Sequence, residues 1–174
     1  MAGPETQALP TAKGAGGVKI SPLDWEQVEE FLNDAGRTVY AEFELDKTEN
    51  KIITHIEVVF TSLDNTIVCE YKDTLETIVD PVVFEEFSDE EIYKRLHKLI
   101  HDFNAVFDDV YYYKSRFDWS DDMKTFEEVA NDFCEFLAEN VDASLEHLVY
   151  NLECEARLRK EERKRKEEDW GDEP

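Results

Sequence analysis

The chain has 174 residues, with 43 acidic and 19 basic side chains and a formal net charge of −24. This length predicts one domain with a core of its own, and the apolar content of 41% is too high for a wholly disordered acidic tail. A charge of this sign disfavours direct binding to nucleic acid or to an anionic membrane, and it favours a basic protein as partner.

Charge is unevenly distributed along the chain. Residues 1–17 are rich in Ala, Gly, Pro and Thr and lack apolar periodicity, which predicts a disordered leader. Residues 18–156 are predicted to form the acidic domain, because residues 21–156 carry 35 acidic and ten basic side chains. Residues 157–174 carry seven of each sign and predict a mixed-charge helical extension or tail. No apolar run has the length of a membrane span or the pattern of a secretory signal, so we expect a cytoplasmic protein.

The first half of the domain is predicted to hold one helix and three strands. Ser21 and Pro22 are typical of a helix start, and Gly36 follows the end of the apolar spacing. Alternating apolar and polar residues then predict an antiparallel meander of strands over 38–46, 52–60 and 67–71. The outer face of this sheet is expected to show Tyr40, Glu42, Glu44, His55 and Glu57, either as a docking surface or simply as a solvated face.

The second half is predicted to be helical. Ser88 and Glu91 have the spacing of a capping box, and an apolar stripe follows from Ile92 to Val110. A second helix is predicted from about Ser120 and a third from Asp142. The whole order predicts an α+β fold, with an N-terminal helix, a three-stranded antiparallel meander and three helices packed on one face of the sheet.

No motif predicts catalysis, a metal site or a cofactor site. The chain lacks the zinc-protease, nucleophile-elbow and phosphate-loop patterns. Its three cysteines (Cys69, Cys134 and Cys154) are widely spaced, which predicts reduced structural thiols. The acids around Trp119 fit a weak divalent-cation site or, more simply, a helix N-terminus. We therefore expect a non-enzymatic protein without metal or cofactor.

A stretch rich in both acids and aromatic rings, residues 102–122, carries the strongest functional signal. Helical spacing cannot bury Tyr111, Tyr112 and Tyr113 together, so at least one ring is expected at the surface. Exposed rings among carboxylates suit recognition of Arg and Lys side chains, because the rings supply contact area and the carboxylates accept charge-assisted hydrogen bonds. The alternative is that the rings pack at the edge of the core with only their hydroxyls in water.

The sequence thus predicts an acidic inhibitor that sequesters a basic, nucleic-acid-binding protein by occupying its nucleic-acid surface. In size, acidity and aromatic content the chain is similar to phage inhibitors that mimic DNA and to bacterial immunity proteins, without a motif of either. The predicted contact residues are Glu42, Glu44 and Glu57 from the sheet and Asp108, Asp109, Tyr112, Asp118, Trp119, Asp121 and Asp122 from the helical side.

Two other interpretations of the charge stay open. An acidic chaperone or assembly factor for basic clients would share this composition, and adaptation to high salt ranks last because twelve of the nineteen bases are lysine. Within residues 157–166, seven of the ten side chains are basic. This run is interpreted as a solvated helix end, a nuclear-import-like patch, or a strap that folds back over the acidic body.

Overall fold

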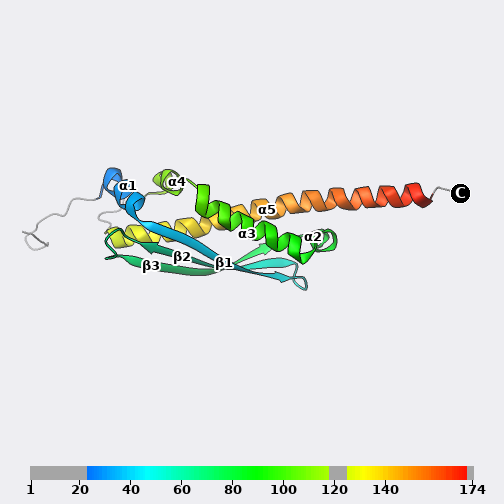
Figure 1. Ribbon diagram of the computed structural model, residues 1–174, viewed down its shortest axis with the longest axis horizontal. Coiled ribbons are helices and arrows are strands. Elements are labelled where there is room, and N and C mark those ends of the chain that lie inside the picture. The colour runs from blue at the N-terminus through cyan, green and yellow to red at the C-terminus, as the bar shows by residue number, and fades with distance from the viewer. Residues whose placement is uncertain (1–22, 118–124, 172–174) are drawn as a thin grey trace, which may run out of the picture.

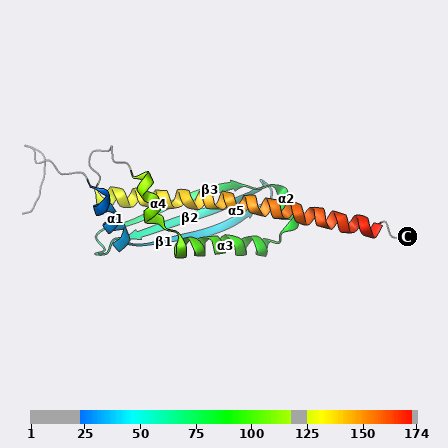
Figure 2. The same cartoon turned by 90° about the horizontal axis from the view of Figure 1, so that it is seen from above.

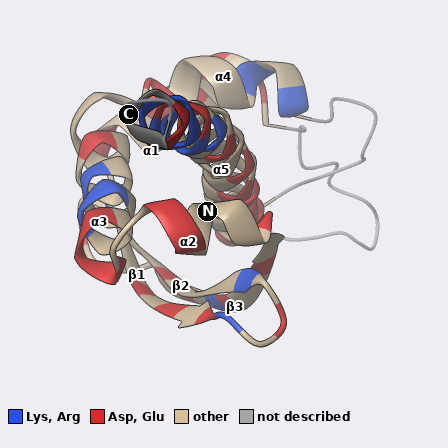
Figure 3. Cartoon of the chain, turned by 90° about the vertical axis from the view of Figure 1, so that its right-hand side faces the viewer, with Lys and Arg blue, Asp and Glu red and all other residues tan. Residues whose placement is uncertain are grey.

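The computed structural model describes residues 23–117 and 125–171. Within these residues a first helix is followed by a three-stranded antiparallel sheet and four further helices. The predicted α+β fold, with helices on one face of the sheet, is confirmed (Figure 1). The other face is covered by no described element (Figure 3). Residues 1–17, the predicted leader, lie outside the described part of the chain.

Helix α1 (Trp25–Asp34) begins later than predicted. Asp24 is its N-cap and accepts a hydrogen bond of 2.9 Å from the backbone N–H of Gln27, whose side chain accepts one of 2.9 Å from the N–H of Asp24. This capping box starts the helix at Trp25, so the predicted start at Ser21 is wrong. Ser21 itself lies outside the described residues.

The sheet consists of β1 (Gly36–Asp46), β2 (Lys51–Thr61) and β3 (Val68–Ile78) in that order, as the predicted meander requires. The turns contain Asn50 and Asn65 at φ of 53° and 62°, a left-handed conformation that asparagine tolerates. Strand β3 continues to Ile78, well beyond its predicted end. The apolar alternation leads to an inner face that includes the buried side chains Val39, Phe43, Ile52, Ile56, Val58 and Phe60.

A short helix that the sequence pattern does not predict, α2 (Pro81–Glu86), follows the sheet. Asp80 is its N-cap and accepts a hydrogen bond of 3.0 Å from the N–H of Val82, while Pro81 occupies the first turn, where a missing N–H costs nothing. The hydrogen bond from the backbone N–H of Val82 lowers the pKa of the Asp80 carboxyl, and the Arg157 side chain lowers it further.

Helix α3 (Asp89–Val106) begins with the predicted capping box of Ser88 and Glu91. The predicted stripe does not continue to Val110, because α3 ends at Val106 and Val110 belongs to a separate helix, α4 (Asp109–Arg116). Val106 is 79% exposed, which corrects its predicted place on the buried stripe. Within the following helix Tyr113 is fully buried, while Tyr111 and Tyr112 are exposed, as predicted for at least one of these rings.

Helix α5 (Phe126–Gly171) is a single helix of 46 residues, about 70 Å long. Thr125 and Glu128 start it with reciprocal hydrogen bonds of 3.1 and 2.8 Å. The predicted helix start near Ser120 lies outside the described residues, and the predicted start at Asp142 is wrong because α5 continues through this residue. Neither glycine nor proline occurs from Phe126 to Trp170, and a buried stripe passes Asp142 without a change of phase. None of the described helices is long and apolar enough to cross a membrane.

The C-terminal part of α5 extends past the sheet as a straight helix (Figures 1 and 2). Its first turns contact acidic residues of α2 and α3: Arg157 lies 3.1 Å from Asp80, and Arg163 donates to both carboxylate oxygens of Glu86 at 2.7 Å. The Arg159 guanidinium lies 4.0 Å above the ring of Phe87. The strap interpretation requires this segment to fold back over the acidic body. Up to Gly171 the helix instead continues past the sheet and does not cover the outer sheet face.

Candidate protein-binding surface

The face of the sheet that points away from the helices carries more carboxylates than lysines. Side chains alternate along a strand, and the register pairs Tyr40 with Glu57 and Glu57 with Lys72, so these three lie in one row across the sheet. The next row contains Glu42 and His55. We call this surface the acidic sheet face; its charged side chains are Glu42, Glu44, Asp46, Glu57, Glu70, Glu76, Lys51 and Lys72.

The predicted outward orientation of this face is confirmed. Glu42, Glu44 and His55 are exposed, and Glu57 is half-buried. Tyr40 is 55% exposed, so a large part of its ring faces solvent on a rigid strand. This orientation is predictable because the two-residue period of a strand determines the face of every side chain once one face is apolar.

Three of the carboxylates are engaged in exposed pairs within the face. Glu44 accepts from His55 Nε2 at 2.6 Å, Glu76 from Lys51 Nζ at 3.1 Å, and Glu57 lies 3.9 Å from Lys72 Nζ. Among the described residues, Glu42 and Glu70 form no ion pair. Exposed pairs of this kind contribute about 0–1 kcal/mol, so an external cation can replace their partners.

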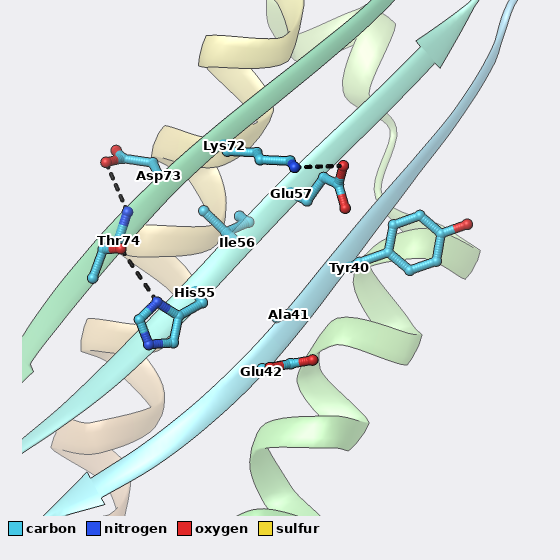
Figure 4. Close-up of a pocket in the computed structure, with 9 residues that line it drawn as sticks. All are labelled: Tyr40, Ala41, Glu42, His55, Ile56, Glu57, Lys72, Asp73 and Thr74. Carbon is cyan, nitrogen blue, oxygen red and sulfur yellow. Dashed lines mark hydrogen bonds and ion pairs between the residues drawn. The ribbon is translucent and has the colours of Figure 1, made fainter.

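The centre of the acidic sheet face is a shallow depression of about 740 Å³ between the rows (Figure 4). Glu57 and Lys72 point toward each other on one side of it, and His55 lies 3.3 Å from the hydroxyl of Thr74 on the other. The depression is open and its floor is the backbone of β2, so it suits a protruding side chain better than an enclosed small molecule.

The predicted residues of the helical side divide into two kinds. Asp108 is exposed and its side chain makes no capping hydrogen bond, and Tyr112 is 53% exposed and stacks on Phe107 at 5.5 Å. Asp109 instead accepts two hydrogen bonds from Arg37, at 2.7 and 2.8 Å, and its side chain is only 14% exposed. We therefore assign Asp109 a structural role and leave Asp108 and Tyr112 as surface candidates.

The remaining predicted residues, Asp118, Trp119, Asp121 and Asp122, lie outside the described part of the chain. The structure does not bring the two described groups together. Helix α4, with Asp108 at its start, lies on the helical side of the molecule, whereas Glu42, Glu44 and Glu57 lie on the opposite, sheet side (Figures 1 and 3). A single partner surface cannot contact both groups at once unless it wraps around the domain.

An acidic ridge, which was not predicted, runs along α5. Glu135, Glu139, Asp142 and Glu146 recur at helical spacing on one side of this helix. Arg116 of α4 contacts Glu135 at 3.0 Å and also pairs with Glu139. The predicted helix start at Asp142 separated these residues; a continuous phase of 3.6 residues from Phe126 onward would have grouped them.

Replacement of Asp142 by asparagine is expected to stabilise the protein near pH 7, by about 0.2–0.5 kcal/mol for the like-charge i,i+4 pair with Glu146. Burial, followed by Glu146 and Asp73, raises the pKa of Asp142. The folded protein therefore binds this proton more tightly than the unfolded chain, and stability is lost as the pH rises through the titration range of Asp142. The gain should disappear below about pH 3.9, where the carboxyl is neutral in both states. Urea unfolding of both proteins across this range measures it.

Asp64 provides the control with the opposite sign. Hydrogen bonds from Thr66 and Ser62 lower the pKa of Asp64. Its contribution to stability is present above the pKa of the unfolded chain and is lost as the pH falls through the lowered, folded-state pKa. Asp64→Asn should therefore destabilise near pH 7, and an Asp142→Asn variant with the same pH profile as Asp64→Asn would contradict the assignment.

Two of the three cysteines lie in the core. Cys69 and Cys134 are buried, and burial raises the pKa of Cys134 to about 12, which keeps the thiol protonated and a poor nucleophile. No three His, Cys, Asp or Glu side chains of the described part lie in an arrangement that could hold a metal ion. What the described surface can do chemically is bind cations and cationic groups.

Comparison of the chain with protein-family models, with curated proteins and with solved structures gives no significant match.

Proposed function

We propose that this protein binds and sequesters a basic, nucleic-acid-binding protein in the cytoplasm, and that its acidic sheet face occupies the partner's nucleic-acid surface. The observation that carries the proposal is that Glu42 and Glu44 follow the exposed Tyr40 along β1, and Glu57 lies opposite Tyr40 on β2, on a sheet face that no described element covers. Carboxylates stand in for phosphates, and the tyrosine ring provides the apolar anchor.

The spacing of the carboxylates supports this role. Residues two apart on a strand, such as Glu42 and Glu44, are about 7 Å apart along it, and neighbouring strands lie about 4.8 Å apart. The face is therefore a two-dimensional array of negative charges on a rigid support. A cationic groove that binds a nucleic-acid backbone can approach such an array without ordering a flexible loop first.

The net charge of the whole chain supports the same function at longer range. A charge of −24 creates a negative field that accelerates encounter with a basic protein and repels nucleic acid. On contact, a cationic side chain of the partner can replace Lys72 beside Glu57. The cost is small because this ion pair is exposed.

The test starts with affinity capture of the partner from native cells, followed by competition for that partner with nucleic acid. We expect nucleic acid and this protein to displace each other. The triple variant Glu42→Gln, Glu44→Gln and Glu57→Gln should weaken binding roughly tenfold and reduce its salt dependence, as measured by titration calorimetry at several salt concentrations.

A matched control removes the same charge elsewhere. Glu26, Glu29 and Glu30 are exposed on α1, and their triple change to glutamine alters the net charge equally. This control should leave affinity nearly unchanged. Equal losses in both triple variants would show that only net charge matters, and simultaneous binding of nucleic acid and this protein to the partner would eliminate mimicry.

An acidic chaperone or assembly factor for basic clients is the second candidate. The observation that favours it is the exposed basic run Lys164, Arg165 and Lys166, which forms no ion pair with a described residue and is accessible to an import receptor. In Figure 3 the blue bands of lysine and arginine at this end of α5 alternate with red bands of acidic residues. The capture experiment separates the two functions, since a chaperone brings down several basic clients and an inhibitor brings down one.

A further inference from the structure

On the helical side of the molecule two neighbouring depressions lie beside α3 and α5. Their volumes are about 400 and 450 Å³, and Leu99 and Ser144 line both of them. We call this pair the α3–α5 groove; its apolar side chains are Leu99, Phe103, Val106, Phe107, Tyr112 and Leu148. Val106 is 79% exposed and Tyr112 53% exposed, although both lie beside other apolar groups. These exposed side chains provide apolar contact area within the depressions.

The groove has a rigid aromatic floor. The rings of Phe103 and Phe107 stack at 4.6 Å, and those of Phe107 and Tyr112 stack at 5.5 Å with an interplanar angle of 7°. Phe107 also lies 6.5 Å from the ring of Phe136, which belongs to the buried core. The floor is thus held in place from below, and an occupant need not order it.

The dimensions suit a helix. The lining residues of α5 run from Asn140 to Asn151, about 16 Å along the helix axis, which corresponds to about three turns of an occupant that lies along it. Three turns present apolar side chains at positions i, i+4 and i+7 to a groove, the usual pattern of helix-in-groove recognition. Polar side chains of α5, Ser144 and His147, are available at its rim for hydrogen bonds.

The charge near the groove favours a basic helix of another protein over a second copy of this chain as the occupant. Asp102 and Asp108 line the end of the groove next to α4. Asp102 forms an exposed pair with Lys98 at 2.5 Å, which a partner's cation can replace at little cost, and the exposed carboxylate of Asp108 makes no capping hydrogen bond. A second copy of this chain would bring a further net charge of −24 toward the same surface and would be repelled. A helix with lysine or arginine beside its apolar stripe is attracted instead.

We propose that the α3–α5 groove binds an amphipathic helix of a partner protein, with an apolar stripe on the groove floor and lysine or arginine next to Asp102 and Asp108. Helices α3 and α5, which line the groove, lie on the side of the sheet opposite to the acidic sheet face, so this inference does not depend on the proposed function of the sheet (Figures 1 and 3).

The test uses the full chain and a labelled synthetic peptide of roughly 16 residues, which forms about four turns. Leucine occupies one helical stripe of the peptide and lysine the other positions. A second peptide has the same composition with its leucines distributed around the helix. Fluorescence anisotropy at physiological salt should show at least roughly tenfold tighter binding of the striped peptide, because only that one can place its leucines in the groove.

Two matched variants locate the site. Val106→Lys introduces a cation into the groove and should weaken binding of the striped peptide roughly tenfold. Leu63→Lys makes the same chemical change at a side chain 73% exposed in the turn between β2 and β3, and it should leave binding unchanged. Circular dichroism verifies that both variants are folded. Absence of binding to the unaltered protein, equal affinity for the two peptides, or equal effects of the two variants would each overturn the proposal.

Discussion

Replacement of Phe133 by alanine is expected to reduce the free energy of unfolding by about 3–5 kcal/mol. This ring is fully buried on α5 and lies between the sheet and α4: its centroid is 6.4 Å from that of Phe60 and 5.0 Å from that of Tyr113. The Arg37 guanidinium lies 5.4 Å from the same ring. Loss of the ring would remove contacts with three elements at once and leave a cavity. Small shifts of the surrounding side chains cannot fill that cavity.

Chemical denaturation followed by circular dichroism measures this loss. Tyr150→Ala is the matched control, since it also replaces an aromatic residue of α5, one that is 59% exposed. The control should change the free energy of unfolding by less than about 0.5 kcal/mol. A loss in Phe133→Ala no larger than that of the control would contradict the packing described for this ring.

Replacement of Arg37 by alanine is expected to cost about 2–4 kcal/mol of unfolding free energy. Its guanidinium donates two hydrogen bonds to Asp109 and further bonds to the backbone carbonyls of Leu32 and Ala35. The Arg37 and Asp109 side chains are 20% and 14% exposed. Removal of the cation leaves a largely buried carboxylate without its main partner, which is the costly case for such pairs.

A double-mutant cycle with Asp109→Ala tests whether this pair is a unit. The coupling energy should be about 1–3 kcal/mol, because each single change already removes the interaction. The exposed pair Glu57 and Lys72, 3.9 Å apart, is the control and should show no coupling beyond experimental error. An Asp109→Ala variant of normal stability and reduced affinity for a basic partner would reverse the assignment and make Asp109 a binding residue.

The sheet was predictable because apolar and polar residues alternate regularly along short stretches of the sequence. Alternate residues of a strand face opposite sides, so the apolar set from Val39 to Phe60 also determined the outward set that includes Glu42 and Glu57. The capping box of Ser88 and Glu91 was predictable for the same reason, since its two hydrogen bonds join residues only three apart.

The helical half was harder to divide because local signals there are ambiguous. Asp142 resembles an N-cap in sequence, yet it lies inside a helix whose buried stripe continues in phase from Val129 to Ala156. Val106 fits an apolar stripe by spacing, but α3 ends at this residue and no described element packs over it. Spacing along a helix identifies a face and not what covers it.

The sequence by itself determined the sign and size of the charge, the α+β class and the outward side of each strand. These follow from composition and from periods of a few residues. Only the tertiary structure decided how the acids are used, because contacts between distant segments set their roles. Asp109 meets Arg37, which lies 72 residues earlier, and becomes structural, while Asp108 beside it stays on the surface. The net charge of −24 therefore resolves into an acidic sheet face, an acidic ridge on α5 and an apolar groove with an acidic end.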